Sequence, residues 1–320
     1  MTRLGYQIPN FTYPGKNDAD IFPTVVKQAK AAEEAGFDRV FVMDHFYQLP
    51  GIGDPDDPMF ECYTILGALA QHTEKVRLSA LVTGNTYRNP AILAKTITTL
   101  DHVSGGRATL GIGSGWFELE HDAYGIPFNT FSERFEKLEE ALQIIVPMLN
   151  GERPTLDGTH YQVADAINSP APLSTIPIMI GGSGEKKTLR MVAQYANESN
   201  LTCTVEEIPR KLDALAGHCE RLGRDRSDIK VTKLVMGVIG RTMEEAEASI
   251  DEFIALHGWP AEVAAMYKGM ATMGDPDSFG EQIKAMIDAG LDGVTLNLVP
   301  NGHDPEMVAL AAECADAAIG

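Results

Sequence analysis

An aspartate and a histidine follow directly on a run of apolar residues and are the first candidates for chemistry. Residues 39–43 read RVFVM, and Asp44 and His45 come next. The carboxyl end of a buried strand is where an α/β protein presents functional side chains to a cleft. A neutral histidine can relay a proton near pH 7, and a neighbouring carboxylate can accept a hydrogen bond from a ligand N–H. The structural alternative is a core ion pair or a helix cap.

A glycine-rich turn after another apolar run is suited to an anion. Residues 178–187 read IMIGGSGEKK, which predicts a strand, a tight turn and the start of a helix. Free backbone amides at Gly181, Gly182 and Ser183, together with the positive end of the helix dipole, would bind a phosphate-like group. The two lysines that follow add positive charge. A plain tight turn is the structural alternative.

A second glycine-rich segment, GIGSGWF, occupies residues 111–117. Its backbone around Gly113 and Ser114 could approach a flat or bulky group closely, because glycine has no Cβ. Trp116 is either a wall of the resulting pocket or a core residue. Thr83 follows another predicted strand and adds a hydroxyl at the same kind of position.

The acidic segment ELEHD at residues 118–122 has metal-ligand residue types but not their spacing. Adjacent residues at the start of a helix cannot all point one way. A solvated first turn is therefore expected for Glu118, Glu120, His121 and Asp122, and no metal site is predicted there.

Alternating strand and helix patterns must hold these candidates in place. Strands are predicted at residues 4–8, 39–43, 76–82, 108–113, 177–180, 198–202, 229–239 and 294–298. Helical patterns fill the connections, so these units favour a (β/α)8 TIM barrel with insertions, in which the candidate residues share the rim at the strand carboxyl ends. A doubly wound sheet would need a GxGxxG turn after the first strand, and IPNFTYPG is not one.

The barrel pattern leaves room for insertions but not for a second domain. We predict one domain over residues 1–320, with insertions near 46–60, 150–176 and 257–276. The middle insertion contains RPTLDGTHYQV at 153–163, whose Asp-Gly turn predicts a hairpin.

Composition limits the partners. The chain has 320 residues, 44% of them hydrophobic, and a net charge of −19, which argues against nucleic acid or an anionic membrane as a partner. The four cysteines lack zinc spacing and are predicted to be reduced thiols. We find no signal-peptide pattern and no stretch of roughly 20 apolar residues, so we expect a cytoplasmic protein.

Three motifs in order resemble the luciferase-like monooxygenase superfamily. They are DHF at 44–46, the segment VTGNTYRNPAILAKTITTLDHVSGGRATLGIGSGWFELEHDAYGIPF at 82–128, and IPIMIGGSGEKKTLRMVAQYA at 176–196. The similarity extends over most of residues 1–300. It is greatest to the actinobacterial oxidoreductases that use the deazaflavin coenzyme F420.

The resemblance implies a TIM barrel that binds a flavin or deazaflavin in its rim cleft and forms a homodimer. His45 would be the catalytic proton donor or acceptor beside the ring. A non-proline cis peptide near Ala80–Leu81 would bulge against the ring, and the glycine-rich turn would hold the phosphate. The implied cofactor-binding residues are Asp44, His45, Ala80, Leu81, Thr83, Gly113, Ser114, Gly181, Gly182 and Ser183.

Two positions depart from the F420-dependent glucose-6-phosphate dehydrogenases of this family. Trp116 stands where those enzymes have an acidic residue, and Leu49 stands near the offset of an expected tryptophan. A sugar-phosphate dehydrogenase is therefore not expected.

The predicted function is hydride transfer between coenzyme F420 and a small organic substrate, with His45 managing the proton. The deazaflavin reacts poorly with oxygen, so its enzymes usually move hydride. The sequence also leaves open an FMN-dependent two-component monooxygenase of the same fold and a non-catalytic flavin-binding barrel.

Overall fold

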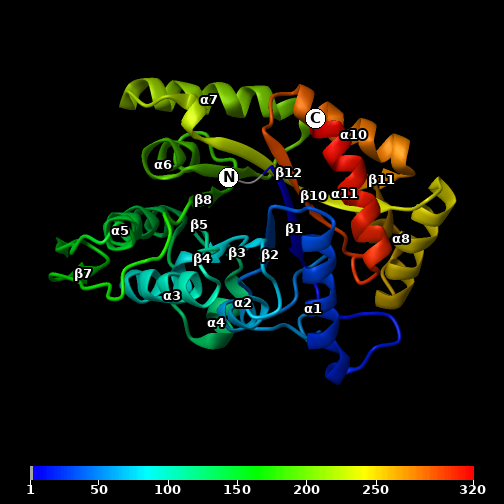
Figure 1. Ribbon diagram of the computed structural model, residues 1–320, viewed down its shortest axis with the longest axis horizontal. Coiled ribbons are helices and arrows are strands. Elements are labelled where there is room, and N and C mark those ends of the chain that lie inside the picture. Colours follow the sequence, from blue (N-terminus) through cyan, green and yellow to red (C-terminus); the bar gives the residue numbers. More distant parts are fainter. Residues whose placement is uncertain (1–2) are drawn as a thin grey trace.

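A barrel of parallel strands surrounded by helices forms the body of the computed structural model, which describes residues 3–320 (Figure 1). The strands are β1 (Leu4–Ile8), β2 (Arg39–Val42), β3 (Arg77–Ala80), β4 (Thr83–Gly84), β5 (Leu110–Gly113), β8 (Ile178–Gly181), β9 (Glu198–Leu201), β10 (Lys230–Ile239) and β12 (Gly293–Asn297). They pair in the order β3-β2-β1-β12-β10-β9-β8-β5-β4, and every neighbouring pair is parallel.

The barrel closes between β3 and the start of β5. The Leu78 amide donates to the Arg107 carbonyl at 2.9 Å, and the Thr109 amide donates to the Leu78 carbonyl at 3.0 Å. Strand β4 continues the line of β3, so these two strands share one position around the barrel. The nine strands therefore occupy eight positions, here called staves, and the predicted (β/α)8 barrel is confirmed.

The third stave, predicted as one strand, is broken in the middle. The peptide bond between Leu81 and Val82 is cis, one residue further along than the predicted position near Ala80–Leu81. The Val82 side chain then points at two neighbouring staves, where a Cβ added to Gly113 or Gly181 would lie 2.9 Å from a Val82 methyl carbon. Both glycines therefore leave the space that Val82 fills.

Helices cover the outside of the barrel. They are α1 (Asp18–Glu34), α2 (Cys62–Leu69), α3 (Pro90–Val103), α5 (Phe131–Leu149), α6 (Thr188–Tyr195), α7 (Ile208–Leu222), α8 (Met243–His257), α10 (Pro276–Asp288) and α11 (Pro305–Ile319). Helix α5 begins with a capping box in which Thr130 and Glu133 satisfy each other's backbone amides.

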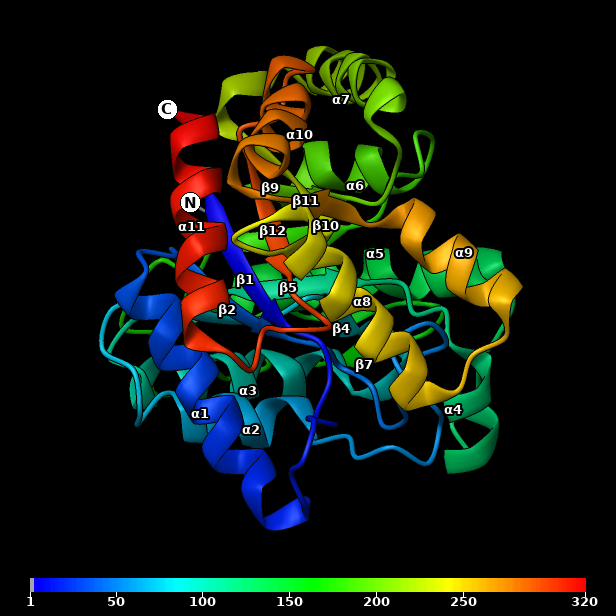
Figure 2. The same ribbon diagram turned by 90° about the vertical axis from the view of Figure 1, so that its right-hand side faces the viewer.

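Smaller elements lie in the connections. They are the hairpin β6 (Leu156–Asp157) and β7 (Gln162–Val163), helices α4 (Glu118–Tyr124) and α9 (Ala261–Met270), strand β11 (Thr272–Gly274), and the 3₁₀ turns η1 (Asn85–Tyr87), η2 (Val205–Glu207) and η3 (Arg226–Asp228). The hairpin predicted within 153–163 is confirmed. Figure 2 shows α8 and α9 together on one side of the barrel. The single-domain boundaries and the three insertions stay predictions.

The core has an apolar layer and a charged end. Most buried apolar side chains lie in one cluster, while Phe41, Leu81 and Met179 form a small separate cluster. At the amino ends of the strands, Arg39 of β2 forms two hydrogen bonds of 2.8 and 3.0 Å with Glu198 of β9, and both side chains are 1% exposed.

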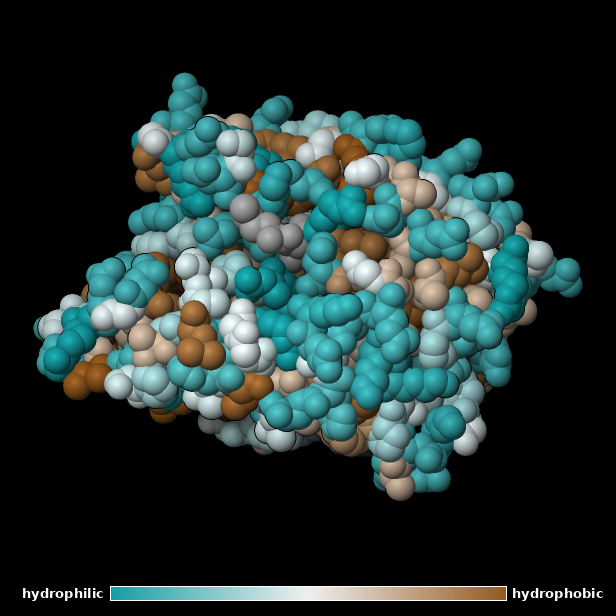
Figure 3. All heavy atoms as spheres, viewed as in Figure 1, coloured by the Kyte–Doolittle hydropathy of each residue, from teal (hydrophilic) through white to brown (hydrophobic). Residues whose placement is uncertain are grey.

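Hydrophilic residues dominate the surface in the view of Figure 3, as the net charge of −19 leads one to expect. Within residues 3–320, none of the helices combines the length and the apolar character needed to cross a bilayer. All four cysteines are free thiols, and three of them are buried.

Candidate active site

A cleft of about 490 Å³ opens where the strands end. Most of the predicted residues line it, namely Asp44, His45, Leu81, Thr83, Gly113, Ser114, Gly181 and Gly182. Ala80 is fully buried in β3, and neither it nor Ser183 is among the lining residues. Since β2, β4, β5 and β8 converge here, the rim predicted from the barrel topology brings these segments together.

His45 is held by a carboxylate from a different connection. Its Nδ1 lies 2.8 Å from Glu120 Oε2, and the His45 side chain is 12% exposed while that of Glu120 is fully buried. Glu120 belongs to α4, which follows β5. The end of β2 and the connection after β5 are thus tied together across the mouth of the barrel.

Three further donors surround the Glu120 carboxylate. It accepts hydrogen bonds from the Phe46 amide, from the Tyr47 amide at 2.9 Å and from the Tyr87 hydroxyl. Burial alone would raise the pKa of Glu120, but the bonds from His45, Tyr87 and Tyr47 outweigh it and leave that pKa below its usual value. Glu120 is therefore an ionised carboxylate at neutral pH.

The charge on Glu120 fixes the tautomer of His45. An ionised carboxylate can only accept, so Nδ1 carries the hydrogen and Nε2 is left as the second ring nitrogen. Within the described part of the chain, Nε2 has no hydrogen-bond partner, and His45 lines the cleft. A histidine in this state can take up or return a proton at Nε2.

The expectation of a solvated first turn at 118–122 is wrong for half of its residues. Glu120 and His121 are fully buried, whereas Glu118 and Asp122 are exposed. His121 bonds through Nε2 to Thr86 Oγ1 at 2.7 Å. The face of α4 that is turned toward the barrel mouth carries Glu120, the second acid of this helix.

Asp44 forms a buried ion pair, the structural role weighed for it from the sequence. Arg88 forms two hydrogen bonds with its carboxylate, at 2.6 and 2.8 Å, and the Gly84 amide donates a third at 2.9 Å. Burial raises the pKa of Asp44, and Arg88 and the Gly84 amide oppose that rise. Asp44 ties the end of β2 to β4, and its direct contact with a cofactor stays a prediction.

Thr83 is also engaged within the protein. Its Oγ1 lies 2.5 Å from the Tyr63 hydroxyl, and its side chain is fully buried. The Tyr63 ring lies under the Arg88 guanidinium, 4.8 Å from the ring centroid. Thr83 and Asp44 thus belong to one buried network beside His45.

The glycine-rich turn after β8 offers free amides, one residue later than predicted. The Gly182 amide donates to the Asn200 carbonyl at 2.9 Å, and Ser183 Oγ accepts from the Thr202 amide at 2.7 Å. Within residues 3–320, the amides of Ser183 and Gly184 donate no hydrogen bond. They stand before the N-terminus of α6, where the helix dipole favours an anion.

Lys187 lies at the N-cap of α6, beside this turn, and Arg134 of α5 lies in the cleft lining. Lys187 has no carboxylate partner among the described residues, and its Nζ donates to Ser132 Oγ at 3.0 Å. Arg134 lines the cleft and donates to the carbonyls of Gly115 and Asn129 at 3.2 and 2.8 Å.

Trp116 is a wall of the cleft and not a core residue. It is 59% exposed, stacks on Phe117 with ring centroids 5.1 Å apart, and meets the His45 ring edge at 5.9 Å. Of the two roles that the sequence allowed for Trp116, the structure shows the pocket wall.

Sequence reasoning missed Glu120, Tyr87, Arg88 and Arg134. Successive helical residues are separated by about 100°, so Glu118 and Glu120 point about 200° apart. No spacing signal tells which of the two faces inward, because that depends on how α4 packs against the barrel.

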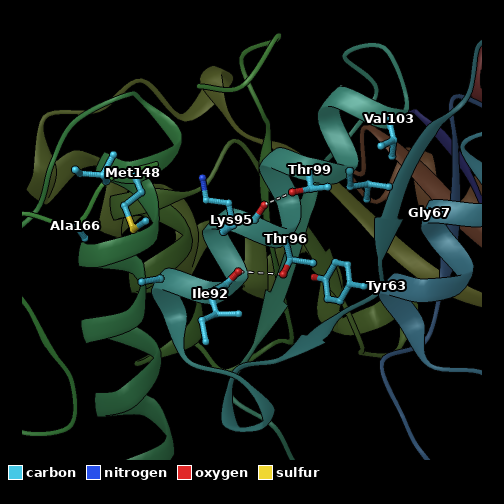
Figure 4. Close-up of a pocket in the computed structure, with 12 residues that line it drawn as sticks. Tyr63, Gly67, Ile92, Lys95, Thr96, Thr99, Val103, Met148 and Ala166 are labelled. Carbon is cyan, nitrogen blue, oxygen red and sulfur yellow. Dashed lines mark hydrogen bonds between the residues drawn. The ribbon is translucent and has the colours of Figure 1, made fainter. Parts of the chain in front are cut away.

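A second groove, of about 450 Å³, runs along α3 and lacks free polar groups (Figure 4). The Thr96 and Thr99 hydroxyls donate to the carbonyls of Ile92 and Lys95 in their own helix, and Lys95 Nζ donates to the Ser169 carbonyl. Its remaining lining is mainly apolar. This groove can support packing but holds no chemistry.

The barrel and its rim cleft define a family. A luciferase-like monooxygenase family model matches residues 2–293, and the chain belongs to that family. The family predicted from the three motifs is confirmed.

The names of similar proteins are more specific than the name of the family. A curated F420-dependent glucose-6-phosphate dehydrogenase from Microbacterium testaceum is 31% identical over 301 residues, which is 86% of each chain. Among solved structures, an F420-dependent secondary alcohol dehydrogenase in complex with an F420-acetone adduct has a TM-score of 0.81 at 20% identity, with 100% and 99% of the two chains covered. The F420-dependent tetrahydromethanopterin reductase from Methanopyrus kandleri has a TM-score of 0.78 at 18% identity, with the same coverage. At these identities the two structures show the fold alone.

Proposed function

We propose that this protein is an oxidoreductase that uses coenzyme F420 to transfer hydride to or from a small organic substrate. The observation that carries the proposal is His45 in the rim cleft, oriented by the ionised Glu120 and with Nε2 free. The relatives named for coenzyme F420 support the choice of cofactor. Enzymatic function follows from the family, whose relatives are dehydrogenases and monooxygenases.

The residues of the cleft fit a phosphate-bearing deazaflavin. The amides of Ser183 and Gly184 donate no bond within residues 3–320, so they are available to phosphate oxygens. Lys187 supplies positive charge beside that turn, and Arg134 adds a cation to the cleft lining. The ring would lie toward His45, where Leu81, Val82 and neighbouring residues line the cleft.

Coenzyme F420 supplies two-electron hydride chemistry when it is bound. The protein supplies the proton route: His45 Nε2 accepts or donates the proton at the substrate, while Glu120 holds the imidazole in its orientation. The Asp44–Arg88 pair holds the β2 end, which fixes the backbone from which His45 projects.

Neither FMN-dependent oxygenation nor a non-catalytic role is proposed. No residue of the cleft favours FMN over coenzyme F420, and a non-catalytic barrel would have no use for an oriented histidine with a free nitrogen. Homodimer formation and a cytoplasmic location stay predictions.

The proposal is tested by separating binding from turnover. Purified protein is titrated with coenzyme F420 and with FMN, and binding is followed by the change in cofactor fluorescence. The protein should bind coenzyme F420 more tightly than FMN. His45→Ala should keep that affinity but lower kcat by about 10²–10⁴-fold, the range for a lost acid–base group. His72→Ala changes an exposed histidine that does not line the cleft, so it is the control and should leave both unchanged. Tighter binding of FMN, or full turnover in His45→Ala, would contradict the proposal.

A further inference from the structure

The charges and aromatic rings around His45 indicate which substrates the cleft can take. We infer that this end of the cleft binds an uncharged substrate carrying a flat apolar group, and that it selects against phosphorylated substrates. The inference rests on the proposed function, because it concerns the second ligand of the same cleft. It also separates this chain from the sugar-phosphate substrate named for its relatives.

Among the described titratable groups that line the cleft, Arg134 is the one permanent cation. Asp44, His45 and Arg134 are the ionisable acid, histidine and arginine of the lining, together with the Tyr87 phenol. Arg88 lies behind Asp44 and is fully used by two carboxylates, those of Asp44 and Glu61.

Arg134 is partly engaged by the protein. Its guanidinium donates to the carbonyls of Gly115 and Asn129 and lies over the Phe128 ring, 3.9 Å from the centroid. Its Nε and one Nη are therefore occupied by backbone carbonyls. A phosphate placed near His45 would meet the negative charge of Glu120 with this partly engaged arginine as its cation, and desolvating such a group carries a large free-energy penalty.

The walls around His45 are apolar and aromatic instead. Trp116 lines the cleft and lies edge-on to the imidazole, with ring centroids 5.9 Å apart, and the buried Phe117 lies edge-on to the same ring at 5.8 Å. Met43, Leu49 and Leu81 also line this side, with Phe131 and Leu234 among the other apolar lining residues.

Trp116 is available for contact because 59% of its surface is exposed at the wall of the cleft. An aromatic group stacked on another ring gains favourable free energy beyond that of its buried area. A neutral aromatic substrate that covers Trp116 therefore gains both apolar burial and ring stacking, without the cost of desolvating a phosphate.

Intrinsic fluorescence tests the inference because the chain has only two tryptophans, Trp116 and Trp259. Trp259 packs in a separate cluster with Phe253 and His257, so Trp259→Phe leaves Trp116 as the sole reporter. In that variant, 1-phenylethanol should change the Trp116 emission saturably, with at least tenfold higher affinity than its phosphate monoester or glucose 6-phosphate. Equal or tighter binding of either phosphate, or no saturable binding of the alcohol, would overturn the inference.

Calorimetry on variants locates the effect. Trp116→Ala should weaken 1-phenylethanol binding by about tenfold, while Leu119→Ala, an exposed apolar residue that does not line the cleft, should not. If a phosphate does bind tightly and Arg134→Gln abolishes that binding, Arg134 serves the substrate and the inference is wrong.

The cofactor titration keeps this result apart from the proposed function. Failure of coenzyme F420 to bind, together with preference for the neutral alcohol, would reject the proposed function and leave the selectivity standing. Binding of coenzyme F420 together with preference for the phosphate would do the reverse.

Discussion

The two ends of β2 carry charged pairs with opposite designs. At its amino end, Arg39 and Glu198 exchange two hydrogen bonds across the barrel, and both side chains are 1% exposed. Just beyond its carboxyl end, His45 shares only one nitrogen with Glu120 and keeps the other free in a cleft.

The pair at the amino end of β2 can serve only the fold, whereas the pair beyond its carboxyl end can also act on a ligand. The pair at the amino end is closed: the partners lie on strands that are not neighbours, and neither is open to a ligand. In the open pair at the carboxyl end, the buried Glu120 carboxylate accepts hydrogen bonds from four donors. The partly buried His45 keeps its Nε2 free of a protein partner among the described residues. Substitutions in each pair, and an acid titration of the open one, test whether the two designs differ in this way.

Breaking the closed pair should have the largest effect on stability. Arg39→Ala leaves the Glu198 carboxylate buried without its guanidinium, which costs about 3–5 kcal/mol. We expect urea unfolding to show a loss of that size, with the coenzyme F420 affinity of the folded variant unchanged because the cleft lies at the other barrel end.

A paired replacement is the control for the closed pair. Arg39→Met combined with Glu198→Leu removes both charges and should recover most of the lost stability, since apolar groups of similar volume often replace buried ion pairs without cost. A loss of cofactor affinity in Arg39→Ala would show that the two ends of β2 are coupled.

Changing the open pair should affect turnover more than folding. Glu120→Gln keeps the shape of the side chain but removes the negative charge that orients the His45 ring. We expect kcat to fall by about 10²-fold, near the lower limit for acid–base catalysis, with little change in KM.

Glu120→Asp separates charge from geometry at the same position. This variant restores the carboxylate on a shorter side chain and should regain part of the lost kcat. If Glu120→Gln instead keeps full kcat, Glu120 has only a structural role, and the two pairs on β2 are alike.

The barrel could be predicted because its signals are local. Each strand is a short apolar run ending near glycine or a polar residue, and each helix has its own periodicity, so most elements lie within two or three residues of their predicted bounds. The broken third stave could not be read from periodicity, because RLSALVTG continues as an apolar run through the break.

The site could be predicted only as far as the strand ends reach. His45 and the glycine-rich turn follow strands directly, whereas Glu120 and Arg88 approach them through tertiary packing. The pairing of Asp44 with Arg88 spans 44 positions, and that of His45 with Glu120 spans 75. No local pattern states which of several acids and arginines will meet across the rim.

Removing a single donor to Glu120 should have a smaller effect. Tyr87→Phe keeps the ring but deletes the hydroxyl that donates to the carboxylate. A hydrogen bond to a charged group contributes about 1.5 kcal/mol at the low end of its range, so urea unfolding should show a loss near that value. Tyr63→Phe deletes a bond to the neutral Thr83 and should cost less. Equal losses would mean that the charge on Glu120 adds nothing to its hydrogen bonds.

Acid titration should give the smallest and most specific signal of the open pair. The folded-state pKa of Glu120 is lower than its usual value of 4.5, so its ionised form stabilises the fold above that value. This contribution is lost as the pH falls through the lowered folded-state pKa. The difference in unfolding free energy between wild type and Glu120→Gln should therefore be largest above about pH 5 and shrink on acidification. Glu33 and Glu140 also have lowered pKa values, but they are present in both proteins and cancel. Urea unfolding at several pH values from neutral to about 3 measures the difference, and a constant difference would show that Glu120 is not held ionised by its four donors.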